Sequence, residues 1–435
     1  MGKKIVKYLL TAVVALGALY GIGRLGVAWY ESYGYVDRQP YLQKATTSGV
    51  VLKWQTPVAE KGCVAYGIDE AWNEVCEKKP TQFHRIGLTG LKKAAEYRYK
   101  VLSASLKIDN SGRSFSTLDD NDSMKQTVWI LGDSGHRNKS QQDVKKAMFR
   151  HLHGRKIDTW IMLGDNAYTD GTQEQYNRGM FNAYPEMFKT NVLWSVIGNH
   201  DARRFAYYDI MEFPTHGASG GTASGSEKYY AFEQGNVHFV MLDSSTAERS
   251  AEGEMARWLE RDLKANKKLW TVAAFHCPPY TKGTHNSDSV KDSGGCMVQM
   301  RENIVPILEK YDVDLVLSGH SHDYERSDLM HGHYGYSDTF DPSKHAVRSK
   351  TDDYSKCKTK KPQGGALYIV AGASSAGRYG IHPFRRLHPA MKLGYFTDGS
   401  LLLTVEGERL TGEYVTNEGT VLDRFSVVKR SDCRQ

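Results

Sequence analysis

Gly132-Asp133-Ser134-Gly135 directly follows the apolar run of residues 128–131, and polar clusters follow apolar runs at four more places along the chain. Short runs rich in valine, isoleucine and leucine that end at a polar cluster are typical of buried strands. Helical patterns lie between these runs, which predicts βαβ units whose polar clusters meet at the carboxyl ends of the strands. The other clusters are Gly164-Asp165-Asn166-Ala167-Tyr168, Gly198-Asn199-His200-Asp201, His276 and Gly319-His320-Ser321-His322.

Two stretches carry the periodicity of amphipathic helices. In the first, Ser140 and Asp143 predict a capping box, and apolar residues repeat every four positions from Val144 to Leu152. The second covers residues 254–264, where apolar side chains share one face. These helices alternate with the apolar runs, as α/β proteins require.

The five clusters supply carboxylates, an amide, imidazoles and a phenol, which are enough donors for two metal ions that share one carboxylate. Two metal ions about 3.5–4 Å apart can activate water and stabilise an in-line displacement at phosphorus. A single Asp or Asn after a strand is usually a turn former. That interpretation would have to hold for all five clusters at once, so the sequence favours a metal site. The other histidines are predicted to lie on the surface or in loops, namely His136, His151, His153, His216, His238, His331, His333 and His388.

In this order the clusters match the patterns GDxG, GDxxY, GNH with an acidic residue, a lone His, and GHxH followed by Tyr-Glu-Arg. The set resembles the calcineurin-like metallophosphoesterases, and Tyr168, three residues after Asp165, resembles the purple acid phosphatase branch. The resemblance implies an α/β fold in which an N-terminal β-sandwich precedes a four-layer domain of two mixed sheets flanked by helices. Asp201 and Ser321 depart from the usual Glu and Val, and neither is a ligand in the family.

The resemblance also implies a dinuclear metal site in which a hydroxide bound to the metals attacks phosphorus. Three residues would bind Fe(III), three others would bind a divalent Fe, Zn or Mn ion, and one carboxylate would bridge the two ions. His200 resembles the histidine that contacts phosphate, and His285 occupies the place where some members carry an acid for the leaving group. The implied ligands are Asp133, Tyr168 and His322 for Fe(III), Asn199, His276 and His320 for the divalent ion, and Asp165 as the bridge.

The expected function is hydrolysis of small phosphate monoesters, as in an acid phosphatase. A phosphodiesterase or nucleotide hydrolase using the same site is an alternative, and a non-catalytic, membrane-tethered binding protein is another. The complete ligand set argues against a non-catalytic protein. The net charge of +7 favours anionic substrates, but no basic helix or RNA-binding motif accompanies it, so no nucleic-acid-binding module is expected. The sequence makes no prediction of oligomeric state.

The length of 435 residues suggests more than one domain. Residues 1–35 are predicted to be a signal peptide or membrane anchor, because Lys3, Lys4 and Lys7 precede the apolar residues 8–23. The charge asymmetry predicts export of the rest to the periplasm, the exterior or the outer face of a membrane.

Alternating apolar residues predict a β-sandwich over residues 36–123, which resembles the fibronectin type III-like domain of purple acid phosphatases. Residues 124–430 would form the metallophosphoesterase domain. Within it, residues 336–363 are predicted to be a long loop, and residues 401–405, 414–415 and 424–428 to be closing antiparallel strands.

Six cysteines allow fifteen disulfide pairings. Proximity in the sequence favours Cys63–Cys76 and Cys277–Cys296, which leaves Cys357–Cys433. Such bridges suit an oxidising compartment, and the second would tether the loop that carries His285.

Overall fold

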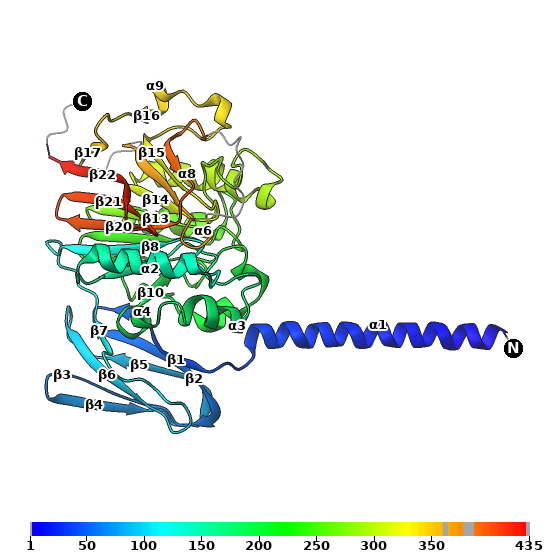
Figure 1. Ribbon diagram of the computed structural model, residues 1–435. Coiled ribbons are helices and arrows are strands. Elements are labelled where there is room, and N and C mark those ends of the chain that lie inside the picture. Colours follow the sequence, from blue (N-terminus) through cyan, green and yellow to red (C-terminus); the bar gives the residue numbers. More distant parts are fainter. Residues whose placement is uncertain (1, 360–363, 377–386, 432–435) are drawn as a thin grey trace.

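The computed structural model describes residues 2–359, 364–376 and 387–431, with side chains from residue 16 onward. A long helix, α1 (Gly2–Tyr33), projects from a body made of a small β-sandwich and a larger α/β part (Figure 1). No helix among the described residues is both long and apolar enough to cross a membrane. The predicted anchor falls partly on residues 8–15, whose side chains lie outside the described part.

Two antiparallel sheets after α1 form the β-sandwich, with strand orders β1-β2-β5 and β4-β3-β6-β7. Their facing side chains, including Leu52, Trp54 and Val64, form a core of their own. The predicted disulfide Cys63–Cys76 is present and joins directly opposed residues of two neighbouring strands. The strands are β1 (Arg38–Thr46), β2 (Gly49–Glu60), β3 (Cys63–Ile68), β4 (Ala71–Cys76), β5 (Thr81–Thr89), β6 (Glu96–Leu102) and β7 (Ser114–Ser116).

The first large sheet has the order β10-β9-β8-β20-β21-β22-β17, with β8, β9 and β10 parallel. Its closing strands β20, β21 and β22 are antiparallel, which confirms the strands predicted at residues 401–405, 414–415 and 424–428. The strands are β8 (Gln126–Leu131), β9 (Thr159–Met162), β10 (Leu193–Ser195), β17 (Asp353–Cys357), β20 (Gly399–Glu406), β21 (Arg409–Thr416) and β22 (Val421–Arg430).

The second large sheet has the order β11-β12-β13-β14-β18-β15-β16, and β19 pairs with β15. Strands β12, β13, β14 and β18 are parallel, whereas β11 and β15 run antiparallel to their neighbours. The strands are β11 (Tyr230–Gln234), β12 (Val237–Met241), β13 (Trp270–Ala274), β14 (Leu315–Ser318), β15 (Tyr324–Met330), β16 (Ala346–Val347), β18 (Ala366–Ala371) and β19 (Met391–Tyr395).

The two large sheets pack face to face, with helices on their outer faces. Val272 of β13 points into the core shared with Ile130 of the first sheet, whereas Ala273 points to the outer core with Trp258 of α6 (Glu254–Ala265). Both faces of these strands are buried, which is why they are continuous apolar runs in the sequence. The sandwich and these layers confirm the predicted fold class.

Helix α6 confirms the helix predicted at residues 254–264, but the predicted start of α2 (Lys139–Leu152) was wrong. Asn138 is the N-cap, because its backbone is extended and its side chain accepts a hydrogen bond from the backbone N–H of Gln141. Ser140 therefore lies within the first turn, where its hydroxyl donates to Asp398 instead. The remaining helical segments are α3 (Gln173–Tyr176), η1 (Asn177–Phe181), α4 (Pro185–Thr190), η2 (Asp201–Arg203), α5 (Ala206–Ile210), η3 (Asp292–Gly295), α7 (Cys296–Gln299), η4 (Met300–Ile304), α8 (Val305–Lys310), η5 (Ser337–Thr339) and α9 (Pro342–His345).

The prediction of a single long loop at residues 336–363 was also wrong. The segment contains η5, α9, β16 and β17, and β17 pairs in parallel with β22. Lys356 of β17 is buried and lies 2.9 Å from Asp312 and 2.7 Å from Asp314. A lysine normally marks an exposed position, and only the folded chain brings these carboxylates to it.

Candidate metal centre

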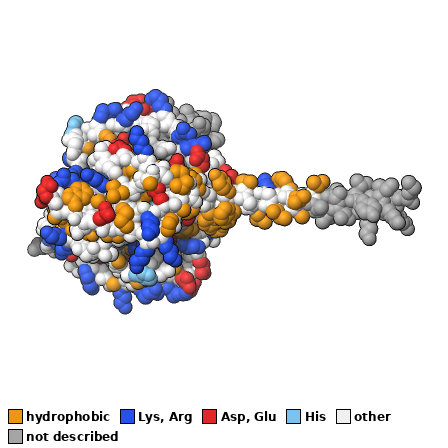
Figure 2. All heavy atoms as spheres, turned by 90° about the horizontal axis from the view of Figure 1, so that it is seen from below, with side chains coloured by type: hydrophobic (Ala, Val, Ile, Leu, Met, Phe, Trp, Pro, Cys, Tyr) orange, Lys and Arg blue, Asp and Glu red, His pale blue; other side chains and the backbone are white. Residues whose placement is uncertain are grey.

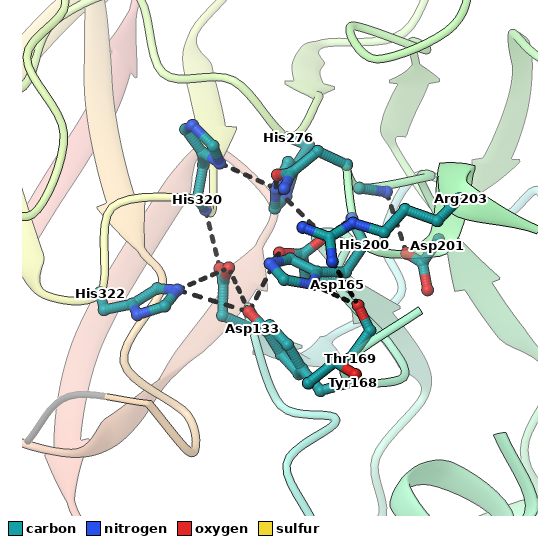
Figure 3. A network of polar contacts seen from close by, with 12 residues as sticks. Asp133, Asp165, Tyr168, Thr169, His200, Asp201, Arg203, His276, His320 and His322 are labelled. Atoms are coloured by element: carbon teal, nitrogen blue, oxygen red, sulfur yellow. Dashed lines mark hydrogen bonds and ion pairs between the residues drawn. The ribbon is translucent and has the colours of Figure 1, made fainter. Parts of the chain in front are cut away.

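The five polar clusters meet at one edge of the two large sheets, because each follows the carboxyl end of a parallel strand (Figure 3). The first sheet contributes the loops after β8, β9 and β10, and the second contributes those after β13 and β14. In that order the loops carry Asp133, Asp165, Asn199, His276 and His320.

Backbone hydrogen bonds join the loops that carry the two carboxylates. The N–H of Asp133 donates to the carbonyl of Gly164 at 3.2 Å, and the N–H of Gly135 donates to that of Asp165 at 3.3 Å. Asp133 and Asp165 adopt positive φ angles of 54° and 50°, a region that aspartate tolerates better than most residues. A Cβ atom added to Gly198 would lie 2.1 Å from Oδ1 of Asp165, so this close approach requires glycine.

Asp201 fastens the loop after β10 to the loop after β9. Its buried carboxylate accepts hydrogen bonds from the backbone N–H groups of Asn166 and Gly198, the Asn166 side-chain amide and the Tyr176 hydroxyl. Burial and the nearby Asp165 raise the pKa of Asp201. Asp201 is therefore a structural cross-link, consistent with a residue that is not a ligand.

Tyr168 reaches both buried carboxylates. Its hydroxyl lies 3.1 Å from Oδ1 of Asp133, 3.0 Å from Oδ2 of Asp165 and 3.4 Å from Nε2 of His322. Burial and the two carboxylates raise the pKa of Tyr168 well above its usual value. A bound cation would favour the phenolate instead, because its positive charge reverses these effects.

The hydrogen bonds of two histidines leave lone pairs that face each other. Nδ1 of His276 donates to the carbonyl of Leu163 at 2.8 Å, so its Nε2 is an acceptor. The hydroxyl of Ser293 donates to Asp292, so Nε2 of His320 donates to Ser293 Oγ at 2.6 Å and its Nδ1 is an acceptor. These two acceptor nitrogens lie 3.2 Å apart, with no proton available to join them.

Further acceptors surround the same point. Nε2 of His276 lies 3.0 Å from Oδ1 of Asn199 and 3.5 Å from Oδ1 of Asp165. Burial lowers the pKa of His276, but the charges of Asp165 and Asp133 outweigh it and raise the pKa above its usual value. Ligand atoms of Asp133, Asp165 and His276 all lie within 4.8 Å of one another. Converging acceptors under negative potential fit bound cations, and these donor types suit transition metals.

Both predicted catalytic histidines lie beside this cluster. The backbone N–H of His200 donates to Asp165 at 2.8 Å, and its Nδ1 donates to the carbonyl of Thr169 at 2.6 Å. The ring of His285 stacks on that of His320 with centroids 3.9 Å apart. Its Nδ1 lies 2.9 Å from Oδ1 of Asp292, which fixes the orientation of the ring.

The loop that carries His285 is held in three ways. The predicted disulfide Cys277–Cys296 closes it. Ser321 accepts hydrogen bonds from the Thr281 hydroxyl and the Thr284 backbone N–H, and the Thr284 hydroxyl accepts one from the backbone N–H of His322. The hydroxyl of Ser321, where the family often has Val, thus supports the site. Cys433, the predicted partner of Cys357, lies outside the described residues.

The structure brings together all nine residues predicted for the site, and it adds His136. The ring of His136 packs on Tyr168 with centroids 3.6 Å apart and lies 6.2 Å from that of His322. Burial, and then the charge of His322, lower the pKa of His136 to about 4. The sequence offered only a weak signal, namely its position directly after Gly135. The prediction of surface or loop positions was wrong for His238, which is buried in β12, whereas His136, His333 and His388 do lie in loops, the last two of them buried.

Residues 126–324 match the model of the calcineurin-like phosphoesterase family. The chain contains a calcineurin-like metallophosphoesterase domain. Purple acid phosphatase 22 of Arabidopsis thaliana is 31% identical over 206 residues, which cover 45% of this chain and 44% of that protein. Purple acid phosphatase 21 of the same plant is 30% identical over 207 residues and is also covered to 44%. The matched part thus spans less than half the length of these two relatives.

A solved structure shares the fold of this chain. A purple acid phosphatase from yellow lupin (Lupinus luteus) seeds has a TM-score of 0.69 at 19% identity, covering 91% of this chain and 75% of that one. At this identity the likeness concerns the fold alone.

Proposed function

We propose that this chain hydrolyses phosphate monoesters at two metal ions held at the carboxyl edge of its sheets. The observation that carries the proposal is the convergence of buried carboxylate and imidazole acceptors within 4.8 Å of one another. The family match supports phosphoester hydrolysis, and the purple acid phosphatase relatives support monoesters as substrates.

The proposed ligands fall into two sets of different charge. The carboxylate and phenol of the first set suit Fe(III), and the amide and imidazoles of the second suit Fe(II), Zn(II) or Mn(II). When bound, the ions would polarise the phosphoryl group and lower the pKa of a coordinated water. The first set is Asp133, Tyr168 and His322, the second is Asn199, His276 and His320, and Asp165 lies between them.

His200 is the proposed proton donor for the leaving group. Its Nδ1 donates to the carbonyl of Thr169, so Nε2 is the ring nitrogen left to face the substrate, and the imidazolium form would donate its proton from there. This Nε2 lies 3.9 Å from Oδ2 of Asp165. The side chain is partly exposed, which allows a substrate to reach it. His285 is the alternative donor, since Asp292 leaves its Nε2 free in the same way.

Rates on an alkyl and an aryl phosphate monoester test the reaction and the donor together. The parent should hydrolyse both monoesters much faster than a matched diester. His200→Ala should slow the alkyl phosphate about 100-fold and the aryl phosphate far less, because only a poor leaving group needs protonation. His285→Ala, measured on the same two monoesters, tests the alternative donor. Equal losses on both monoesters in His200→Ala would make His200 a positioning residue, and a faster diester than monoester reaction would contradict the proposed substrate class.

We also propose that the chain works outside the cytoplasm, with residues 36–123 as a fibronectin type III-like domain and residues 124–430 as the catalytic domain. The lysines and apolar run of residues 1–35 support export, and so do the two disulfides Cys63–Cys76 and Cys277–Cys296. Cleavage of the exported chain by protease added to intact cells would test this location, and complete protection would contradict it.

A further inference from the structure

The carboxyl-terminal end of α1 is attached to the loop that follows the site residues of β10. Glu31 forms an ion pair with Arg204 at 2.7 Å. The backbone N–H of Phe205 donates to Ser32 Oγ at 3.3 Å, and the side-chain amide of Gln173 donates to the Ser32 carbonyl at 3.0 Å. Ser32 is buried in this contact. The direction of α1 is therefore fixed relative to the catalytic body.

This attachment places α1 on the side of the body where the site lies. Arg203, next to the attachment, donates to the carbonyl of Thr169, which also accepts the bond from His200. Figure 1 shows α1 leaving the body on the side of the green and yellow-green loops that follow β10 and β13. Whatever surrounds α1 thus faces the loops of the candidate metal centre.

The described surface of α1 is mostly apolar, with Arg24 as an exposed charged residue in its middle. Large apolar side chains are exposed from Leu16 to Tyr30, including Trp29 with 63% of its surface accessible. Figure 2 shows hydrophobic side chains gathered where the helix joins the body. The loop after β10 adds to this surface, because Phe205 is 65% exposed and its ring stacks on that of Tyr33 of α1 with centroids 6.4 Å apart. Val290, in the loop of His285, is likewise exposed, at 59%.

A lipid bilayer fits this surface better than a protein partner does. The sequence of residues 8–23 contains no charged residue, and three lysines precede it within the first seven positions. Tryptophan and tyrosine near the body, such as Trp29 and Tyr30, are the residues that gather at membrane interfaces. At 1.5 Å per residue, the helix from Arg24 to Ser32 is only about 12 Å long, so the body would lie close to the lipid headgroups.

We propose that a bilayer covers the apolar surface of α1 and that the site faces this bilayer, so that the substrate is a phosphate monoester carried by a membrane lipid. This inference rests on the proposed function. Water adds its oxygen to phosphorus, the bond from phosphorus to the lipid alcohol oxygen breaks, and that oxygen takes a proton. The products are inorganic phosphate and a lipid alcohol that stays in the membrane.

The full chain, metal-loaded and reconstituted in phosphatidylcholine vesicles, allows a direct test. Phosphate release from phosphatidic acid in the same vesicles is compared with release from glycerol 3-phosphate in solution at equal total concentration. We expect the lipid to react about tenfold faster, because enzyme and substrate share one surface. Hydrolysis of glycerol 3-phosphate alone would overturn the inference and leave the proposed function in place. Hydrolysis of neither substrate would overturn both.

Variants of the exposed apolar residues test the orientation of the site. Phe205→Ser combined with Val290→Ser should lower the ratio of the lipid rate to the soluble rate about fivefold, because weaker apolar contact holds the site less closely to the lipid. Val58→Ser is the matched control, since Val58 is similarly exposed at 56% but lies on β2 of the sandwich. An unchanged ratio in the double variant, or an equal fall in the control, would contradict a site that faces the bilayer.

Discussion

Replacement of Asp201 by Asn should destabilise the fold at the candidate metal centre. The two carboxylate oxygens accept bonds from Gly198 N–H at 2.9 Å, the Asn166 side-chain amide at 2.9 Å and the Tyr176 hydroxyl at 2.5 Å. Oδ1 and Oδ2 also receive the backbone N–H of Asn166 at 3.1 and 3.2 Å. In either orientation the new amide group would point its own N–H bonds at donors, so about two buried groups lose their acceptor.

Each unsatisfied buried donor costs about 1–3 kcal/mol, which gives a loss of about 2–6 kcal/mol in the free energy of unfolding. Total stabilities of about 5–15 kcal/mol are typical, so the loss should be easy to measure by urea unfolding of the metal-free chain. Asp201→Glu keeps the carboxylate, and Asp338→Asn is a control at an exposed carboxylate. If Asp201→Asn unfolded at the urea concentration of the parent, the cross-link assigned to Asp201 would be refuted.

Three further changes probe the surroundings of the site and the sheet behind it. Replacement of both Cys277 and Cys296 by serine should lower the free energy of unfolding in urea by about 3 kcal/mol, because the bridge closes a loop of moderate length. An unchanged urea midpoint would contradict this contribution of the disulfide. Gly283→Ala places a Cβ 1.8 Å from Oδ2 of Asp323, so it should displace the loop of His285 and lower kcat on an alkyl phosphate without changing far-UV circular dichroism; a normal kcat would show that the loop adapts. Burial lowers the pKa of His238, but hydrogen bonds to the carboxylates of Asp262 and Glu233 outweigh this and raise it above its usual value. The stabilisation by protonated His238 is therefore complete below about pH 6.5 and disappears as the pH rises through the raised pKa. The urea midpoint of the parent should fall over this pH range, and that of His238→Asn should change less. Parallel pH profiles of the two midpoints would contradict this.

The site could be predicted from the sequence because its residues lie next to strong local signals. Asp133, Asp165 and His320 each directly follow a buried strand, and parallel strands of neighbouring sheets end at one edge. The order of the clusters then allowed the ligands to be assigned by resemblance. The layered fold followed from the same apolar runs, since strands buried on both faces need cover on both sides.

The features that the sequence did not reveal depend on contacts between distant segments. From the sequence alone, Lys356 is predicted to lie in a loop. In the structure it lies in a sheet, where the carboxylates of Asp312 and Asp314 neutralise its charge. Asn138 and Ser140 are both good helix caps, and only the local backbone decides between them. The packing of His136 on Tyr168 depends on how two loops meet, and neither loop shows it alone.

Metal content measured together with phosphatase activity tests the central claim most directly, with Asp165→Asn compared to the parent. Asp165 lies between the two proposed ligand sets, with one oxygen 3.0 Å from the Tyr168 hydroxyl and the other 3.5 Å from His276. Asp170→Asn, five residues away and outside the cluster, is the matched control. The account predicts two metal ions per chain and active enzyme for the parent and control, and lower metal content without hydrolysis for Asp165→Asn at native circular dichroism. Full activity of Asp165→Asn with two metal ions still bound would contradict it.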